Sequence, residues 1–295
     1  MNTLVQQPAI PPEQIRLKPA RALLGWLPDQ AALNLLAIGQ PGRIQTPTMR
    51  ARWQSAQASV ATREPHAQRE AHISEPPKTL DLHIARLRQD PNLAQEMASG
   101  WRVACVDLRE VRAFQPHVVL SVADESVAGL KAGQMAEVAN VTLPARPGQP
   151  INCQFVDATK TWMVTSRSHN LRIFGPNHLQ LPGALPAFGF AIGELNSMVR
   201  VHQLGTKLVL ADGYHRAVGL LRAGFTEVPV FLRAQPELEG ITPPAGMLPQ
   251  SIFLSDRAPL LPDYLDDQVS AEVMVEESYK MILITAQEIA PGIYK

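Results

Sequence analysis

The chain has 295 residues, of which 45% are hydrophobic and 18% are charged, and its 27 Lys and Arg residues balance 27 Asp and Glu residues. This length predicts one large or two ordinary domains, and the composition is that of a globular protein rather than a disordered chain. The zero net charge argues against a general nucleic-acid coat, because such proteins need excess positive charge to displace counterions from phosphates.

Residues 1–100 are expected to form a helical and linker region. Pro28 is expected to open a short helix that Gly39 closes. Residues 49–77 are polar and predict an exposed helix or linker, and residues 79–99 predict two short helices.

The expected compartment is the cytoplasm. The N-terminus shows no pattern of a secretory signal, and the apolar stretch 22–38 is too short to span a bilayer. Cys105 and Cys153 stand alone, which argues against a thiolate zinc site. We interpret them as two buried small residues in a reducing cytosol, with a single disulfide as the alternative.

From Trp101 the pattern changes to that of short strands. Residues 121–185 combine many β-branched residues with prolines and glycines, which indicates a β-rich insertion. Within it we expect β segments at 137–143, 151–156 and 161–165. The runs 198–203 and 207–212 follow, separated by a short turn, and predict a hairpin.

The next segment, GYHRAVGLLRAG, predicts a helix from about Tyr214 to a C-terminal cap at Gly224. Residues 227–232 return as a strand. The extension 235–295 carries three basic and ten acidic residues, a balance of −7, so the rest of the chain carries +7. Its end reads as two strands turning at 277–279, which predicts a β-hairpin.

The segment 207–232 carries the strongest chemical signal. A helix that starts at about Tyr214 directs its unpaired backbone N–H groups and its positive dipole end out of the preceding turn. Gly213 would let an anion approach the backbone closely, and His215 and Arg216 lie in the first helical turn. Together these features predict a phosphate pocket.

A purely structural interpretation stays open for the same residues. Asp212 and Gly213 could form a tight strand-to-helix turn in which Asp212 acts as the N-cap. Arg216 would then form only a surface ion pair. Both interpretations predict a helix beginning after Gly213.

This stretch resembles the ParB/sulfiredoxin superfamily. Members of that superfamily have a strand, then Gly-x-x-Arg at the start of a helix, a Gly helix end and a Val-Pro-Val strand. Gly213-Tyr214-His215-Arg216 and Val228-Pro229-Val230 stand in those places here. Residues 106–118, VDLREVRAFQPHV, are similar to the opening strand of the superfamily and its Gln-Pro segment. The match covers less than a seventh of the chain.

The resemblance implies an α+β fold, with a ParB/sulfiredoxin-like small mixed sheet and helices at 101–234 and an insertion at about 121–185. The N-terminal region 1–100 and the acidic extension 235–295 would pack onto it. It also implies bound ATP or CTP, with Mg²⁺ accompanying the phosphates. The residues that it assigns to the nucleotide are Asp212, Gly213, Tyr214, His215 and Arg216.

Two departures limit what the resemblance implies. Tyr214 occupies the position of the sulfiredoxin cysteine, so the sulfur chemistry of that enzyme is not expected. The acidic extension stands where chromosome-partitioning ParB proteins have a helix-turn-helix region, which argues against sequence-specific DNA binding. The leading hypothesis is therefore a nucleotide-binding protein that hydrolyses a nucleoside triphosphate or transfers a phosphoryl group, with no catalytic base assigned.

Two alternatives belong to other functional classes. One is a non-catalytic interaction protein that binds a basic partner through the acidic extension, and the other is a metal-dependent nuclease. The arginines between 86 and 112 alternate with acids, which favours a solvated mixed face. Weaker candidates for a site are His202, Gln203, Lys207, His169, Asn170, Asn177 and His178; we expect His202, Gln203 and Lys207 to be solvated and no metal to bind.

Overall fold

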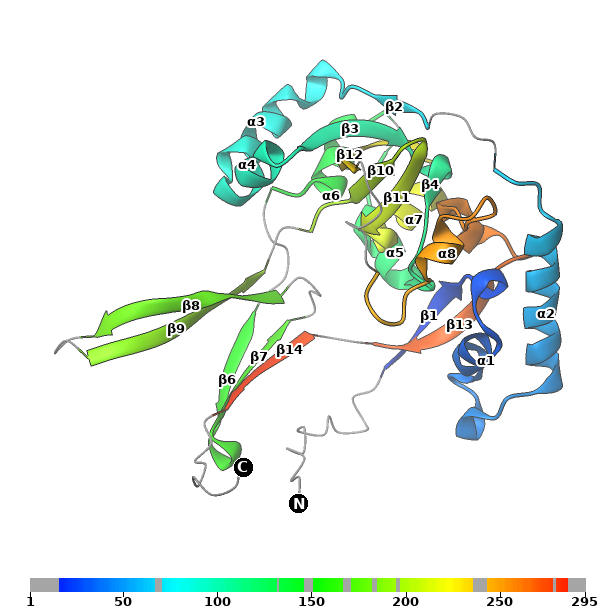
Figure 1. Cartoon of the computed structure of the whole chain (residues 1–295), viewed down its shortest axis with the longest axis horizontal. Coiled ribbons are helices and arrows are strands. Elements are labelled where there is room, and N and C mark those ends of the chain that lie inside the picture. The colour runs from blue at the N-terminus through cyan, green and yellow to red at the C-terminus, as the bar shows by residue number, and fades with distance from the viewer. Residues whose placement is uncertain are drawn as a thin grey trace. The chain divides into compact units, whose positions relative to one another are not determined.

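The computed structural model describes residues 16–66, 71–131, 133–145, 151–166, 171–181, 185–194, 197–235, 243–277 and 280–285. The chain divides into two compact units. Unit 1 comprises Met1–Ala145 and Met198–Glu277, and unit 2 comprises Arg146–Ser197 and Ser278–Lys295. Helices and sheets mix in the described residues, which confirms the predicted α+β class (Figure 1).

A six-stranded mixed sheet forms the centre of unit 1, in the order β2-β3-β12-β10-β11-β4 (Figure 1). Its strands are β2 (Ile73–Ser74), β3 (Trp101–Asp107), β4 (Val111–Arg112), β10 (Arg200–Leu204), β11 (Lys207–Asp212) and β12 (Glu227–Gln235). Strands β10 and β11 pair antiparallel, as the predicted hairpin requires. Strand β10 runs parallel to β12, and β11 runs parallel to β4.

Alternate residues of a strand point to opposite sides of a sheet, and buried side chains of β3 and β12 lie on both sides of this one. One face packs Val106, Val228 and Val230 into the main core. That core includes residues of α5 (Leu120–Val127) and α7 (Tyr214–Arg222). The other face packs Trp101 and Phe231, whose rings stack with centroids 5.1 Å apart, against α3 (Asp81–Gln89) and α4 (Pro91–Ala98).

A second sheet joins the two ends of unit 1. Strand β1 (Leu17–Ala22) lies between β13 (Ala271–Glu276) and β5 (His117–Val119) and is antiparallel to both. The sequence did not predict β1. The predicted helix after Pro28 is α1 (Asp29–Ala37), and the exposed segment that follows contains α2 (Pro47–Thr62).

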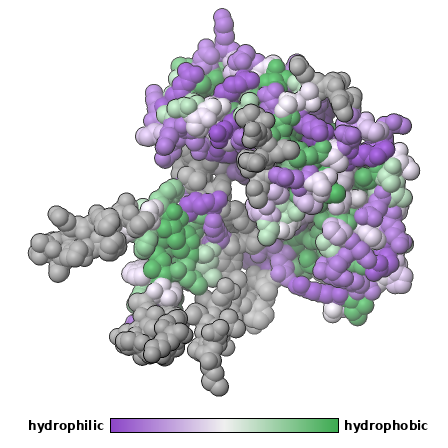
Figure 2. Space-filling view, viewed as in Figure 1, coloured by the Kyte–Doolittle hydropathy of each residue, from purple (hydrophilic) through white to green (hydrophobic). Residues whose placement is uncertain are grey.

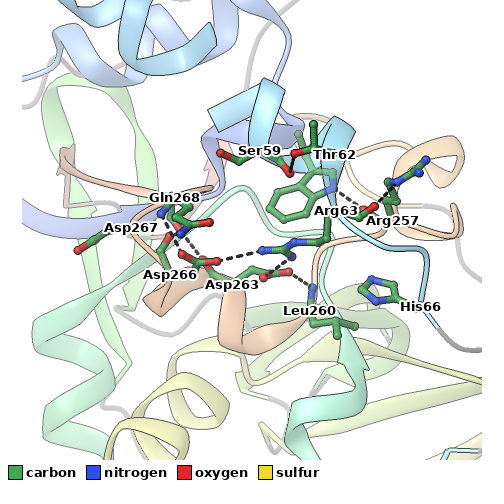
Figure 3. Close-up of polar contacts among 12 residues, drawn as sticks. Ser59, Thr62, Arg63, His66, Arg257, Leu260, Asp263, Asp266, Asp267 and Gln268 are labelled. Atoms are coloured by element: carbon green, nitrogen blue, oxygen red, sulfur yellow. Dashed lines mark hydrogen bonds and ion pairs between the residues drawn. The ribbon is translucent and has the colours of Figure 1, made fainter. Parts of the chain in front are cut away.

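The acidic extension pairs with basic residues from the beginning of the chain. Its acids form ion pairs Lys18–Glu277, Arg21–Asp267, Arg43–Glu276, Arg63–Asp263 and Arg63–Asp266. Figure 3 shows the guanidinium of Arg63 reaching both Asp263 and Asp266. Five of the ten acids of 235–295 are thus paired within unit 1. The negative charge of this extension is therefore partly offset by positive charge from the beginning of the chain.

Two expectations for the strand pattern were wrong. Residues 137–143 do not form a strand but lie largely in α6 (Met135–Thr142), which buries Val138, Ala139 and Thr142 on one helical face. The predicted insertion therefore begins with two helices, α5 and α6, that belong to unit 1. The predicted C-terminal β-hairpin is also wrong, because β13 pairs with β1 whereas β14 (Lys280–Thr285) pairs with β7 (Thr161–Ser166).

Unit 2 is built from strands in its described residues. Strand β7 lies between β14 and β6 (Asn152–Val156) in a three-stranded antiparallel sheet, which confirms the predicted strands near 151–156 and 161–165. Strands β8 (Leu171–Leu181) and β9 (Leu185–Glu194) form a separate antiparallel pair. The remaining short elements are α8 (Gln250–Phe253) and the 3-10 turns at 24–26, 41–43, 78–80, 108–110, 157–159 and 261–265.

Candidate functional site

The turn between β11 and α7 lies where the sequence predicted, but the N-cap of α7 is Gly213 and not Asp212, so the expected N-cap role of Asp212 is wrong. Strand β11 ends at Asp212, and α7 begins at Tyr214 after a cap at Gly213. Gly213 has φ 92° and ψ 23°, a left-handed conformation that glycine adopts without steric cost. The Asp212 carboxylate accepts a hydrogen bond from the Gly213 N–H at 2.7 Å. Asp212 therefore fixes the turn.

A second reason for glycine at position 213 is the neighbouring chain. A Cβ atom there would lie 2.8 Å from Val199 Cγ2 and 2.9 Å from Val199 Cα. No real Cβ sits so close to a backbone atom, so any side chain would displace the segment before β10. Gly213 therefore allows the turn to pack against Val199. The space that a side chain at position 213 would need is filled by Val199.

Tyr214 is committed to the core. Its hydroxyl donates to the Leu210 carbonyl at 2.6 Å and accepts from the Phe114 N–H at 3.0 Å. Burial raises the pKa of the Tyr214 phenol well above its usual range, despite the hydrogen bonds from the 114–115 backbone. The phenol therefore joins the segment 106–118 to the start of α7, the two pieces that the sequence resemblance linked. Its side chain does not extend toward a ligand at the helix start.

Arg216 lies half-buried beside the first turn of α7. Its Nη1 donates to the carbonyl of Val141 at 3.0 Å, in the last turn of α6. Burial lowers the pKa of Arg216, and the negative charge of Asp212 acts in the opposite direction. Arg216 is therefore not a fully solvated surface side chain: its guanidinium is partly desolvated and hydrogen-bonds the negative end of α6.

The first turn of α7 carries basic groups and no acid. His215 and Arg216 both lie there, half-buried, whereas the acid nearest in sequence, Asp212, precedes the cap. Cations near a helix N-terminus oppose the helix dipole by about 0.3–1 kcal/mol each. The first turn of α7 therefore places two basic side chains at the positive end of the helix dipole.

The weaker candidates take structural positions. His202 is buried beside Trp101, with ring centroids 5.0 Å apart, and not solvated as we expected. Burial, and then the charges of Arg233 and Arg200, lower its pKa to about 4. Lys207 Nζ donates to the Leu254 carbonyl at 2.9 Å, so Lys207 too contacts protein. Gln203, on the same strand, donates to the Gly205 carbonyl at 3.3 Å, which places its amide at the hairpin turn.

The candidates in unit 2 provide no site geometry. His169 and Asn170 lie outside the described residues, and for Asn177 and His178 the structure describes only the backbone of β8. Within the described ranges, no group of three or more His, Cys, Asp or Glu residues is arranged to hold a metal ion. Cys105 is buried and Cys153 is exposed, and both are free thiols, so the expectation of two buried cysteines holds for Cys105 alone.

The sequence did not identify two neighbours of the candidate site, Val199 and Val141. Val141 acts through its carbonyl, and Val199 through its Cα atom and side chain; each comes from a segment more than ten residues from the turn. Val141 was assigned to a strand, so its carbonyl could not be placed at a helix end. The pattern of Val138 and Thr142 four residues apart was the available helical signal.

Comparison with known proteins adds no relative. No protein-family model matches the chain, and neither a curated protein nor a solved structure matches it. None of the described helices is long and apolar enough to cross a membrane.

Proposed function

We propose that the chain binds a nucleotide, with its phosphates held at the start of α7. The observation that carries this proposal is the position of two basic side chains, His215 and Arg216, in the first turn of α7 directly after the Gly213 turn. An arginine fork and a helix N-terminus are both typical phosphate ligands. His215 supplies a second basic group in the same turn.

The proposed scaffold is that of the ParB/sulfiredoxin superfamily. Support comes from the order of strand β11, the Gly213 turn, α7 and strand β12, which contains Val228-Pro229-Val230. Further support comes from the contact between Tyr214 and Phe114, which brings the second resembling segment to the same helix. On this proposal the nucleotide is ATP or CTP with Mg²⁺, and hydrolysis or phosphoryl transfer is the reaction class.

The acidic alternative has less support. Half of the acids in 235–295 already pair with Lys and Arg residues of unit 1. An intramolecular ion pair would have to break before such an acid could bind a basic partner. Binding of a basic partner by residues 235–295 is therefore the less favoured function.

The test is isothermal titration calorimetry of the full chain with ATP, CTP and GTP, each with and without Mg²⁺. Arg216→Gln should weaken binding about 10- to 100-fold, the usual worth of charge-assisted hydrogen bonds. Arg222→Gln is the matched control, since Arg222 lies in the last turn of the same helix in an exposed ion pair with Asp124. Circular dichroism checks that both variants fold. If none of the nucleotides binds the wild type at several hundred micromolar, the proposal fails.

A further inference from the structure

The segment 113–116 has no regular secondary structure, and distant parts of unit 1 bond to its backbone. The Ala113 N–H donates to the Pro259 carbonyl at 2.8 Å, and the Phe114 carbonyl accepts from the Leu248 N–H at 2.7 Å. Both partners belong to the acidic extension 235–295. Backbone groups of the extension therefore hold the backbone of this short segment in place.

A third bond from the extension comes from a side chain. The Tyr264 hydroxyl donates to the Gln115 carbonyl. Tyr264 lies in the 3-10 turn 261–265, and its side chain is completely buried. A buried carbonyl that loses its donor keeps the full cost of its desolvation, so this bond favours one position of Gln115. The extension thus bonds to three consecutive residues, from Ala113 to Gln115.

The other side of the same segment is bonded to the first residue of α7. The Tyr214 hydroxyl accepts from the Phe114 N–H at 3.0 Å, and the two rings meet edge to face with centroids 5.7 Å apart. The same hydroxyl donates to the Leu210 carbonyl in β11. The segment 113–116 therefore links the extension to the start of α7.

Apolar packing joins the same parts of unit 1. Phe253 of α8 lies against Phe114, with ring centroids 5.2 Å apart. Hydrophilic residues, in purple, are widespread on the face of unit 1 that Figure 2 shows, whereas Leu248, Phe253, Leu261 and Tyr264 are at most 1% exposed. Closely packed interiors transmit small displacements from one side to the other. The link is therefore made through the core and not across the surface.

The two phenols lie close enough to influence each other. Burial raises the pKa of Tyr264 well above its usual range, and the neighbouring Tyr214 and Asp263 act in the same direction. Burial also raises the pKa of Tyr214. Both hydroxyls are therefore protonated at neutral pH, and each remains a donor to its carbonyl.

We propose that the segment 248–264 is energetically coupled to the phosphate site at the start of α7, with Tyr264 as the positioning residue. This inference rests on the proposed function. A phosphate at the amides that follow Gly213 would restrain the first turn of α7, which begins with Tyr214. Through Phe114 that restraint reaches the extension.

The coupling acts in both directions. A coupling free energy between two sites is reciprocal, so a firmly held extension strengthens phosphate binding, and a bound nucleotide holds the extension more firmly. The nucleotide-bound and nucleotide-free chains therefore differ in the local stability of the segment 248–264. The extension is on this account the part of unit 1 that responds to the nucleotide.

The test compares two variants that each remove one buried hydroxyl donor from the extension. Tyr264→Phe removes the bond to the Gln115 carbonyl. Ser270→Ala is the matched control, because its hydroxyl donates to the carbonyls of Asp263 and Asp266, within the extension itself. Affinity for ATP and CTP, each with Mg²⁺, is measured by calorimetry of the full chain at a temperature where circular dichroism shows all proteins folded. Tyr264→Phe should weaken binding at least about 5-fold and Ser270→Ala less than about 2-fold.

A second measurement uses the wild type alone. Hydrogen exchange of the Leu248 N–H, which donates to Phe114, is followed with and without saturating nucleotide and Mg²⁺. The reference is the Ala94 N–H, which donates to the Asp90 carbonyl in α4. The nucleotide should slow exchange at Leu248 at least about 5-fold more than at Ala94.

The outcomes separate this inference from the proposed function. If neither nucleotide binds the wild type, the proposed function fails and the coupling fails with it. If a nucleotide binds the wild type and Tyr264→Phe equally well, or if Ser270→Ala weakens binding as much as Tyr264→Phe, the coupling alone is wrong. Equal slowing of exchange at Leu248 and Ala94 overturns the coupling as well.

Discussion

Replacing Arg63 by alanine should destabilise unit 1 more than any exposed ion pair could. Arg63 ends α2 and donates to Asp263 at 2.6 Å and to Asp266 at 3.0 Å (Figure 3). Its guanidinium also lies 5.5 Å from the centroid of the Trp26 ring. The Asp263 side chain is only 8% exposed, and burial raises its pKa even though Arg63 and the Leu260 N–H favour the charged form. The carboxylate therefore depends on its partner.

The magnitude follows from these exposures. Removing one member of a buried ion pair costs about 3–5 kcal/mol, and the 24% exposure of Arg63 places the loss at the low end. The Asp266 pair is more solvated and adds less than about 1 kcal/mol. The contact with Trp26 adds about 0.5–1 kcal/mol. We expect Arg63→Ala to lower the free energy of unfolding by about 3.5–5 kcal/mol.

The assay is urea unfolding followed by tryptophan fluorescence in a Trp162→Phe background, so that every remaining tryptophan reports on unit 1. Arg50→Ala is the matched control, because the Arg50–Asp29 pair is about half exposed on both sides and should cost less than about 1 kcal/mol. In an Asp263→Asn background, Arg63→Ala should cost at least about 1.5 kcal/mol less than in the wild type. Equal losses for Arg63→Ala and Arg50→Ala would refute this reasoning.

Three further predictions concern positions that the structure sets apart. Gly213→Ala should destabilise the protein at least about 1 kcal/mol more than Gly224→Ala, since both glycines have positive φ but only Gly213 faces a close neighbour. Equal losses of the free energy of unfolding in urea would count against the packing of Gly213 on Val199. The pKa of His202 is about 4, so the unfolded chain binds its proton first and the free energy of unfolding should fall by about 3 kcal/mol as the pH drops from 7 to 4. His202→Gln should flatten this dependence of the free energy of unfolding on pH. A smaller decrease from His117 should remain, because burial lowers its pKa as well. An unchanged dependence in the variant would show that His202 is not buried. At low micromolar concentration one thiol should react rapidly with a maleimide, because burial raises the pKa of Cys105 to about 11, and Cys153→Ser should abolish the fast reaction.

Local patterns predicted the elements whose signals lie within one segment. The hairpin β10–β11, helix α7 and strand β12 follow from alternation, a glycine turn and a glycine after the helix, all within residues 198–235. The turn at Asp212 and Gly213 was predictable for the same reason. Gly224 shows the expected positive φ after α7.

Long-range pairing was not predictable from the sequence. Strand β1 contains a proline and basic residues, and it is a strand because β13, about 250 residues later, pairs with it. The pattern of β13 and β14 indicated strands correctly but not their partners, since adjacency in sequence favours a hairpin. Helix α6 was missed because valine and threonine favour strands, whereas burial of one helical face decides its structure.

The candidate site shows the same division. The basic residues of the first turn of α7 could be read from the sequence, but the depth of Arg216 could not, because it depends on where the end of α6 packs. The core position of Tyr214 likewise depends on Phe114, a hundred residues earlier.

The most direct test of nucleotide binding is to locate the bound phosphates by NMR. Backbone amide signals of the full chain would be followed during titration with ATP, CTP and inorganic phosphate, with Arg216→Gln as the comparison. We predict the largest shifts at the amides of Gly213 to Arg216, saturating with the nucleotide and absent in Arg216→Gln. Shifts that centre elsewhere in the chain, or no shifts with any of the three ligands, would contradict the proposed site.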